Sequence, residues 1–204
     1  MRVNHSVECR DLACADVRHE GYSVPPVDID PARVSIILVS EAAAADPADG
    51  YYAAGEPLFA QTTVQAFQDA GAPVSSLADV LDLGVYLTTA VKCAKTGYGI
   101  ETATVKQCAG LLAQELALFP QAQALLLMGD VAIKAVNAVA RAAGEARVIP
   151  TGSTYKIRAQ AYSWRGIRVF PSYLQAGPSF FIEKSKRRMI AEDIAAALAL
   201  VSLP

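Results

Sequence analysis

The chain has 204 residues, of which 53% are hydrophobic and 19% are charged, and its formal net charge is −2. This length and hydrophobic content allow a single domain with a sizeable buried core. No apolar run reaches about 18 residues, so no transmembrane helix is expected. The first 21 residues are polar and charged, which argues against a secretory signal, and we expect a cytoplasmic protein.

Apolar runs alternate with amphipathic stretches, which predicts a parallel sheet wrapped by helices. An N-terminal arm, residues 1–32, precedes four expected core strands, which are Arg33–Ser40, Gly84–Lys92, Ala124–Met128 and Ile167–Pro171. Helices are expected at Phe59–Ala70, Glu101–Phe119, Val131–Ala143 and Phe180–Leu200. Ser153–Tyr162 reads as extended and is followed by a turn at Trp164, Arg165 and Gly166. The expected fold class is α/β, one three-layer α/β/α domain over residues 1–204 with a short, mostly parallel four-stranded central sheet.

A loop follows the first expected strand. Residues 42–54 contain Pro47, Gly50 and the adjacent pair Tyr51 and Tyr52. Loops at the carboxyl end of a parallel strand are where open α/β folds bind ligands. We therefore expect a binding site beside this loop.

Four cysteines form two pairs along the chain, Cys9 with Cys14 and Cys93 with Cys108. Without secretion a disulfide framework is not expected, and four thiolates suit a metal, as in a [4Fe–4S] cluster. Zinc is an alternative, although zinc sites favour short spacings in both pairs and here 14 residues separate the second pair. Four unrelated thiols are the remaining alternative, because Cys108 falls on the apolar face of its expected helix.

Positive charge is concentrated near the C-terminus. Between Lys156 and Arg188 there are eight Lys and Arg residues against one acid, Glu183, a net charge of +7 that leaves −9 for the remainder. Such asymmetry is typical of a surface that faces a polyanion such as DNA. The alternative is a solvated basic hairpin and helix.

Several segments resemble the uracil-DNA glycosylase superfamily, specifically its iron–sulfur (family 4) branch, in order along nearly the whole chain. The matching segments are Cys14 with the following ADVR, Ile36–Ala42, Gly55–Phe59, Tyr86–Cys93, Cys108, Leu126–Ala132 and Ser163–Ser172. The resemblance implies that the four cysteines hold a [4Fe–4S] cluster. It also implies base-excision DNA repair, in which the enzyme hydrolyses the N-glycosidic bond of a damaged or deaminated base that is flipped out of the DNA stack.

The chain departs from the family pattern at several functional positions. The first cysteine pair has four residues between its members rather than two, and the GEAPG-like motif has become the run from Ser40 to Ala44. The asparagine that reads uracil falls on Thr89. The histidine of the H-P-S motif is missing, with Gly177 or Leu174 at its place, and the only histidines, His5 and His19, precede the first strand.

The resemblance assigns roles to the remaining residues of the expected site. Glu41 would orient water, Thr89 would contact the base edge with one hydroxyl, and Phe59 would stack on the base, with Ala42 and Gly177 completing the pocket. The ordinary alternatives are a solvated loop carboxylate or a helix N-terminal acid for Glu41, a strand former for Thr89 and a helix-start residue for Phe59. The missing histidine would otherwise stabilise the departing base. Loss of one such donor typically lowers the reaction rate by about 10²–10³-fold.

The segment after the missing histidine supplies the expected DNA contacts. An apolar wedge near Phe180, Phe181 or Leu174 would enter the groove, and the basic residues after it would bind phosphates. The expected DNA-binding residues are Pro178, Ser179, Phe180, Lys184, Lys186, Arg187 and Arg188. Packing of a phenylalanine into the core at the helix start is the alternative for the wedge.

The expected function is a divergent DNA glycosylase, a monomer with DNA as its partner and no membrane association. A non-catalytic DNA-binding or damage-sensing module on the same fold is the first alternative, because the asparagine and the histidine are replaced. A small-molecule or nucleotide-binding protein is the second alternative.

Overall fold

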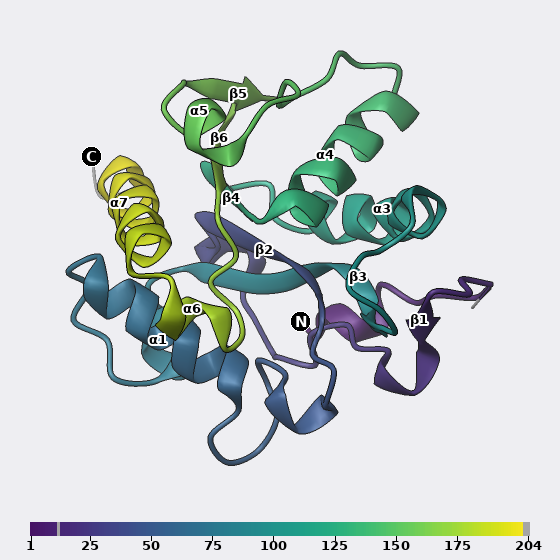
Figure 1. Ribbon diagram of the computed structural model, residues 1–204, viewed down its shortest axis with the longest axis horizontal. Coiled ribbons are helices and arrows are strands. Elements are labelled where there is room, and N and C mark those ends of the chain that lie inside the picture. The colour runs from purple at the N-terminus through teal and green to yellow at the C-terminus, as the bar shows by residue number, and fades with distance from the viewer. Residues whose placement is uncertain (12, 202–204) are drawn as a thin grey trace.

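The computed structural model describes residues 1–11 and 13–201 of the chain (Figure 1). Its centre is a six-stranded sheet with the order β1-β3-β2-β4-β6-β5. The strands are β1 (Val17–Arg18), β2 (Ile36–Ala43), β3 (Val85–Lys95), β4 (Ala124–Met128), β5 (Tyr162–Trp164) and β6 (Ile167–Ser172). The inner four strands are parallel, and the two edge strands are antiparallel to their neighbours.

The prediction of an α/β protein with a mostly parallel sheet is confirmed, but the prediction of four strands is wrong. The two added strands have only two and three residues, too few to show a periodic pattern in the sequence. β1 comes from the N-terminal arm and pairs Val17 with Lys95 at the end of β3. β5 forms a hairpin with β6 through Arg165 and Gly166, both of which have positive φ.

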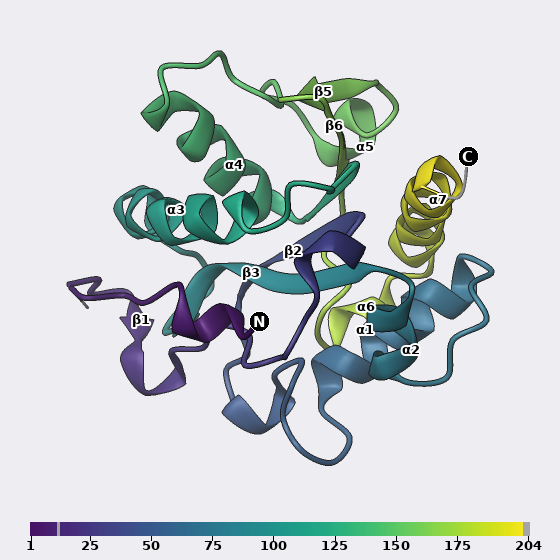
Figure 2. The same cartoon turned by 180° about the vertical axis from the view of Figure 1, so that it is seen from behind.

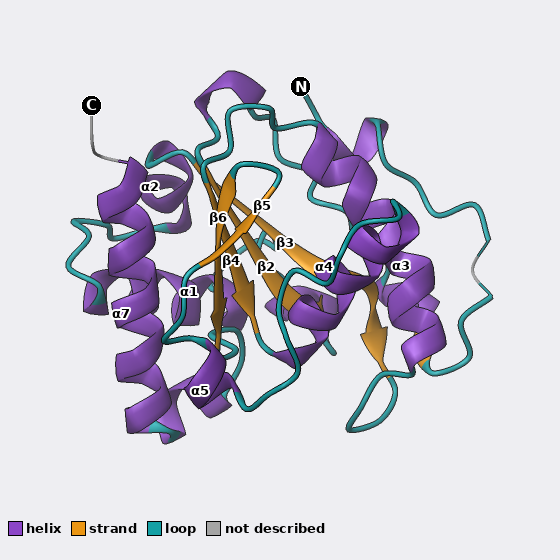
Figure 3. Cartoon of the chain, turned by 90° about the horizontal axis from the view of Figure 1, so that it is seen from above, coloured by secondary structure: helices purple, strands orange, loops and turns teal. Residues whose placement is uncertain are grey.

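Helices cover both faces of the sheet (Figure 3). The α-helices are α1 (Leu58–Asp69), α2 (Leu77–Asp82), α3 (Thr102–Ala117), α4 (Asp130–Ala142), α5 (Thr154–Ile157), α6 (Ser179–Ile182) and α7 (Lys184–Val201). The expected extended stretch Ser153–Tyr162 therefore contains a short helix, α5. The expected C-terminal helix Phe180–Leu200 is divided into α6 and α7 at Glu183, whose backbone is not helical.

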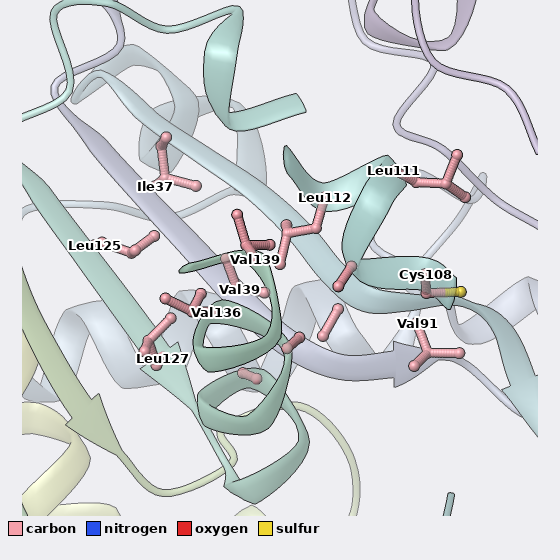
Figure 4. Close-up of a cluster of buried hydrophobic side chains, with 14 of the residues drawn as sticks. Ile37, Val39, Val91, Cys108, Leu111, Leu112, Leu125, Leu127, Val136 and Val139 are labelled. Atoms are coloured by element: carbon pink, nitrogen blue, oxygen red, sulfur yellow. The ribbon is translucent and has the colours of Figure 1, made fainter. Parts of the chain in front are cut away.

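Alternation along the strands separates two cores, because successive side chains of a strand point to opposite faces. Ile37, Val39 and Leu125 pack with α3 and α4 (Figure 4). Ile36 and Leu38 pack with α1, α2 and α7 on the other face. The inner strands are thus buried on both sides, as expected for a parallel sheet between helical layers.

The N-terminal arm packs against the carboxyl end of β3 and the start of α3 (Figure 2). Asp16 holds it there, because its carboxylate accepts hydrogen bonds from the Glu101 N–H (2.6 Å) and the Thr104 hydroxyl at the start of α3. Burial acts to raise the pKa of Asp16, but these hydrogen bonds outweigh it and hold the pKa below its usual value.

Among the described residues, no helix combines the length and the apolar character that crossing a bilayer requires.

Candidate functional site

Two cavities lie beside the N-terminal arm, and they share one residue, Tyr22. The larger, which we name the aromatic cavity, has a volume of about 250 Å³. Arm residues 20–26, the loop after β2 up to Phe59, and Thr88 and Thr89 of β3 border it. This is the carboxyl edge of the parallel strands, where the sequence predicted a ligand site.

Phe59 and Thr89 both line the aromatic cavity, Phe59 from the first turn of α1 and Thr89 from β3. Gly177 does not line the cavity but lies close to Phe59, since a Cβ atom built on it would lie 3.9 Å from the Phe59 ring. The Thr89 hydroxyl makes no hydrogen bond within the described chain, so it is free to bind a ligand. Ala42 is buried and does not line the cavity, whose wall includes the next two residues, Ala43 and Ala44.

Glu41 lies at the same edge of the sheet but on the opposite face. Its carboxylate accepts a hydrogen bond from the Val131 N–H (3.4 Å) at the start of α4, and it does not line the aromatic cavity. Gly129 leaves room for it, because a Cβ atom there would lie 2.5 Å from Glu41 Oε1. The structure therefore brings Phe59, Thr89 and Gly177 together and leaves Glu41 across the strand from them.

A buried polar network fixes one wall of the aromatic cavity. The Gln175 amide donates to the Tyr51 hydroxyl (2.6 Å), to Ser40 Oγ (3.1 Å) and to Thr63 Oγ1 (3.2 Å). Ser40 and Tyr51 also hydrogen bond to each other. The network joins the loop after β6 to β2 and α1, and it holds the Tyr51 ring 5.4 Å from that of Phe59.

The smaller cavity, which we name the cysteine cavity, is lined by all four cysteines. Cys9 and Cys14 come from the arm, Cys93 from β3 and Cys108 from α3 (labelled in Figure 4), and all four thiols are free. The cavity has a volume of about 10 Å³, room for about one water molecule.

The thiols differ in their surroundings. Burial raises the pKa of Cys93 to about 12, with the nearby Cys108 as the next cause. Burial also raises the pKa of Cys108. The arm thiols contact polar groups, since Cys14 Sγ lies 3.4 Å from Gln107 Oε1 and Cys9 Sγ lies 3.3 Å from the Asp11 carbonyl oxygen.

The donor set matches a thiolate-bound iron–sulfur cluster, which takes four cysteines. Within the described residues, no group of three or more His, Cys, Asp and Glu side chains is arranged to hold a metal ion. The four thiols match such a group in residue type and line one cavity, but that cavity has room for only about one water molecule, so the cluster is taken up below as a proposal.

His19 and Tyr22 also line the cysteine cavity, where they were not predicted. His19 Nδ1 lies 3.6 Å from Cys93 Sγ, and its Nε2 lies 2.9 Å from the Cys14 carbonyl oxygen. The Tyr22 hydroxyl accepts a hydrogen bond from the Cys9 N–H (2.9 Å). Their position five and eight residues after Cys14, in an arm expected to bind metal, was the available signal.

A buried ion pair separates the two cavities. Lys92, which lines the cysteine cavity, pairs with Glu115 of α3, and both side chains are fully buried. The Lys92 ammonium also donates to Thr88 Oγ1 (2.8 Å) and to the Thr89 carbonyl (2.5 Å). Glu115 Oε1 accepts hydrogen bonds from the Thr88 (2.8 Å) and Tyr86 (2.5 Å) hydroxyls, so every charged atom of the pair has a partner.

The predicted basic surface is largely neutralised within the chain. Arg187 pairs with Asp69, Lys186 with Glu183 (2.5 Å), and Arg188 with Glu192 (3.6 Å). Lys184 is exposed and has no ion pair within the described residues. The net charge of +7 therefore overstates the positive potential that this segment presents.

The expected wedge segment begins with two exposed residues, Pro178 and Ser179. Phe180 is 2% exposed and packs in the core beside α7, whereas Phe181 is 48% and Ile182 is 77% exposed. An apolar side chain that enters a DNA groove must be accessible, so Phe180 is not positioned for the predicted wedge, whereas Phe181 and Ile182 are exposed.

Comparison with known proteins gave no match to a family model and no match among curated proteins. Among solved structures, the chain is similar to one described as wild-type UNG from Nitratifractor salsuginis. The identity is 14%, the alignment covers 88% of this chain and 81% of the other, and the TM-score is 0.44. A likeness at this level does not bear on function, which has to be argued from the residues of this chain.

Proposed function

We propose that this protein is a divergent DNA glycosylase that hydrolyses the N-glycosidic bond of a damaged base. The observation that carries the proposal is the aromatic cavity, where Phe59 can stack on a base beside the free hydroxyl of Thr89 at the carboxyl edge of the sheet. Base-excising enzymes receive the flipped base in such a pocket, between aromatic side chains and hydrogen-bonding groups.

In this proposal each residue has a defined task. Phe59 stacks on the flipped base, and Thr89 donates or accepts one hydrogen bond at its edge. Glu41 would orient the attacking water, which requires its carboxylate to leave the Val131 N–H and turn to the cavity side of β2. Phe181 and Ile182 fill the space that the flipped base leaves in the stack, and Lys184 contacts a phosphate.

The test is an abasic-site assay with anaerobically purified protein on oligonucleotides that each contain one damaged or deaminated base. We expect abasic product on at least one substrate. Phe59→Ala should reduce the rate by about ten- to a hundredfold, as loss of one base-stacking contact does. Lys184→Gln should weaken binding to every oligonucleotide and reduce the slope of log K against log salt by about 0.9. Clear DNA binding without product on any substrate would overturn the catalytic proposal.

We further propose that the cysteine cavity holds a [4Fe–4S] cluster. When bound, such a group would join the arm to β3 and α3 through Cys9, Cys14, Cys93 and Cys108. Iron analysis and a visible absorption spectrum of anaerobically purified protein test this. We expect about four irons per chain, the number in one such cluster, and loss of iron in Cys93→Ser. A protein without iron, or zinc in its place, would contradict the proposal.

A second candidate function is favoured by the position of Glu41. Because its carboxylate lies across β2 from the aromatic cavity, the cavity can bind a nucleobase without a water-orienting acid beside it. A nucleoside- or DNA-binding module would then bind the same ligands without cleaving them. Glu41→Ala separates the two, since it abolishes excision in an enzyme and leaves binding unchanged in a module.

A further inference from the structure

The side chains that line the aromatic cavity are rich in π electrons and lack positive charge. Four aromatic rings border it, those of Tyr22, Tyr51, Tyr52 and Phe59. The one ionisable group other than tyrosine is the Glu20 carboxylate, and no Lys, Arg or His of the described chain is part of the lining.

The two adjacent tyrosines present their rings rather than their hydroxyls. The Tyr52 hydroxyl donates to the Leu87 carbonyl (2.8 Å), and the Tyr51 hydroxyl lies in the network with Ser40 and Gln175. Burial raises the pKa of Tyr51 to about 12 and also raises that of Tyr52, so both rings are neutral phenols at physiological pH. Ring faces and edges are what remain for a ligand.

The chain around the cavity adds negative charge. From Val34 to Val91 there is no Lys, Arg or His, whereas the loop before α1 carries Asp46 and Asp49 next to the lining residues Pro47 and Gly50. Among the basic side chains close to the cavity, Lys92 is neutralised by Glu115. Arg18 keeps its charge, but it is exposed to solvent, donates to the Ala45 carbonyl (2.7 Å) and is not part of the lining.

This environment disfavours an anionic leaving group. A neutral base such as uracil takes both electrons of the broken bond and departs as an anion, which requires a cation or a strong donor nearby. The cavity offers neutral hydroxyls, those of Thr89 and Ser23 among them, and a carboxylate instead. By contrast, aromatic rings and a carboxylate attract a cation.

We propose that the substrate class of this site is a cationic, ring-N-alkylated base, an inference that rests on the proposed glycosylase function. In 7-methylguanine within DNA, for example, the ring carries the positive charge before the reaction. When the C1′–N9 bond breaks, its electron pair moves to N9 and cancels that charge, so the base leaves neutral. Water forms the new bond to C1′ and releases its proton to solvent. This reaction needs no histidine to stabilise the leaving base.

The experiment compares single-turnover excision from an oligonucleotide methylated with dimethyl sulfate and from the same oligonucleotide carrying uracil. Glu20→Gln removes the negative charge at an exposed position, so the fold is retained. Glu56→Gln is the matched control, an exposed acid close by in sequence that does not line the cavity. We expect release of 7-methylguanine to exceed that of uracil and to fall about three- to tenfold in Glu20→Gln, and to stay unchanged in Glu56→Gln.

A second readout separates failure of this inference from failure of the glycosylase proposal. Binding of free 7-methylguanosine and guanosine is measured at pH 6, where the methylated base is cationic. Preferential excision of uracil would overturn the inference and support the proposed function. If no base is excised, the proposed function fails. The cation preference then stands only if the wild type binds 7-methylguanosine more tightly than guanosine and Glu20→Gln does not. Equal binding of both nucleosides would overturn it.

Discussion

The ion pair of Lys92 and Glu115 stabilises the region between the two cavities. Each is fully buried, and each completes the hydrogen bonds of the other and of Thr88. A buried pair of this kind adds little over apolar residues of similar size, but removing one member leaves the other charge without compensation. Its role is to hold Thr88 and the backbone of Thr89 in place beneath the aromatic cavity.

Lys92→Met should therefore lower the free energy of unfolding by about 3–5 kcal/mol, the usual cost of breaking a buried pair. In the double variant Lys92→Met, Glu115→Gln the loss should be smaller, because a neutral amide oxygen still accepts from Tyr86 and Thr88. Urea denaturation of the three proteins measures this. Equal stability of the single and double variants would show that an uncompensated charge is not the cause.

Gly129 is the residue that determines where Glu41 lies. Its φ is +100°, and a Cβ atom there would lie 2.5 Å from Glu41 Oε1. Gly129→Ala should cost about 1–3 kcal/mol from the backbone alone, and more because Glu41 has to move. Gly144→Ala is the matched control, since Gly144 has a φ of +74° and nothing within 4 Å.

Thermal or urea unfolding compares the two glycine variants. We expect Gly129→Ala to be the less stable of the two, and the added substitution Glu41→Ala to recover part of its loss. If the two glycine variants lose the same stability, contact with Glu41 has no part in the effect.

The helices and strands differ in how clearly the sequence predicts them. The inner strands and the long helices were predictable because their apolar runs are long and bounded by Gly or Pro. β1 and β5 were not, since pairing with a neighbouring strand, rather than local pattern, makes them strands. α2 was not predicted, because it has only six residues. The capping box at its start, formed by Ser76 and Asp79, is visible in the sequence.

The candidate site was predictable to a similar degree. Phe59 and Thr89 were expected in one pocket, and the structure places both in its wall. The face on which Glu41 lies was not predictable, because β2 is apolar on both faces and shows no alternation before it. The ion pairs of the basic residues were also not predictable, because Arg187 pairs with Asp69 of α1, which is far from it in sequence.

The cap of α2 makes a prediction about pH. The Asp79 carboxylate accepts hydrogen bonds from the backbone N–H (2.8 Å) and hydroxyl (2.7 Å) of Ser75 and from the Ser76 N–H (2.9 Å), which lower its pKa to about 2. A lowered pKa stabilises the fold above the unfolded value of about 3.9, and this contribution is lost as the pH falls towards 2.

Asp79→Asn should therefore be less stable than the wild type at pH 7, and the difference should shrink between about pH 4 and pH 2. Unfolding curves at a series of pH values measure this, with Asp82→Asn on the same helix as the control. A difference that stays constant down to pH 2 would mean that the charge of Asp79 does not stabilise the cap.

Across the whole molecule, the N-terminal arm joins otherwise separate parts. It contributes an edge strand, caps α3 through Asp16, supplies two of the four cysteines and forms one wall of the aromatic cavity. Most of it has no regular secondary structure, so its contacts with β3 and α3 have to hold it in place.

If a cluster binds as proposed, metal should protect the arm from proteolysis. Arg10 and Arg18 are exposed, and trypsin should cleave after them slowly in the iron-loaded protein and at least severalfold faster after chelation. Mass spectrometry of the fragments over time measures this. Cys9→Ser, Cys14→Ser should be cleaved rapidly with or without iron, and equal rates in the loaded and chelated wild type would show that the arm is held by protein contacts alone.

Among the residues that the structure describes, Tyr22 alone borders both cavities, and its hydroxyl accepts a hydrogen bond from the Cys9 N–H. A substitution at this position cannot tune one compartment while leaving the other untouched. Both cavities therefore constrain which residues can replace Tyr22. Mutant libraries aimed at changing ligand preference would do better to vary Ser23 or Ala53, which line the aromatic cavity but not the cysteine cavity.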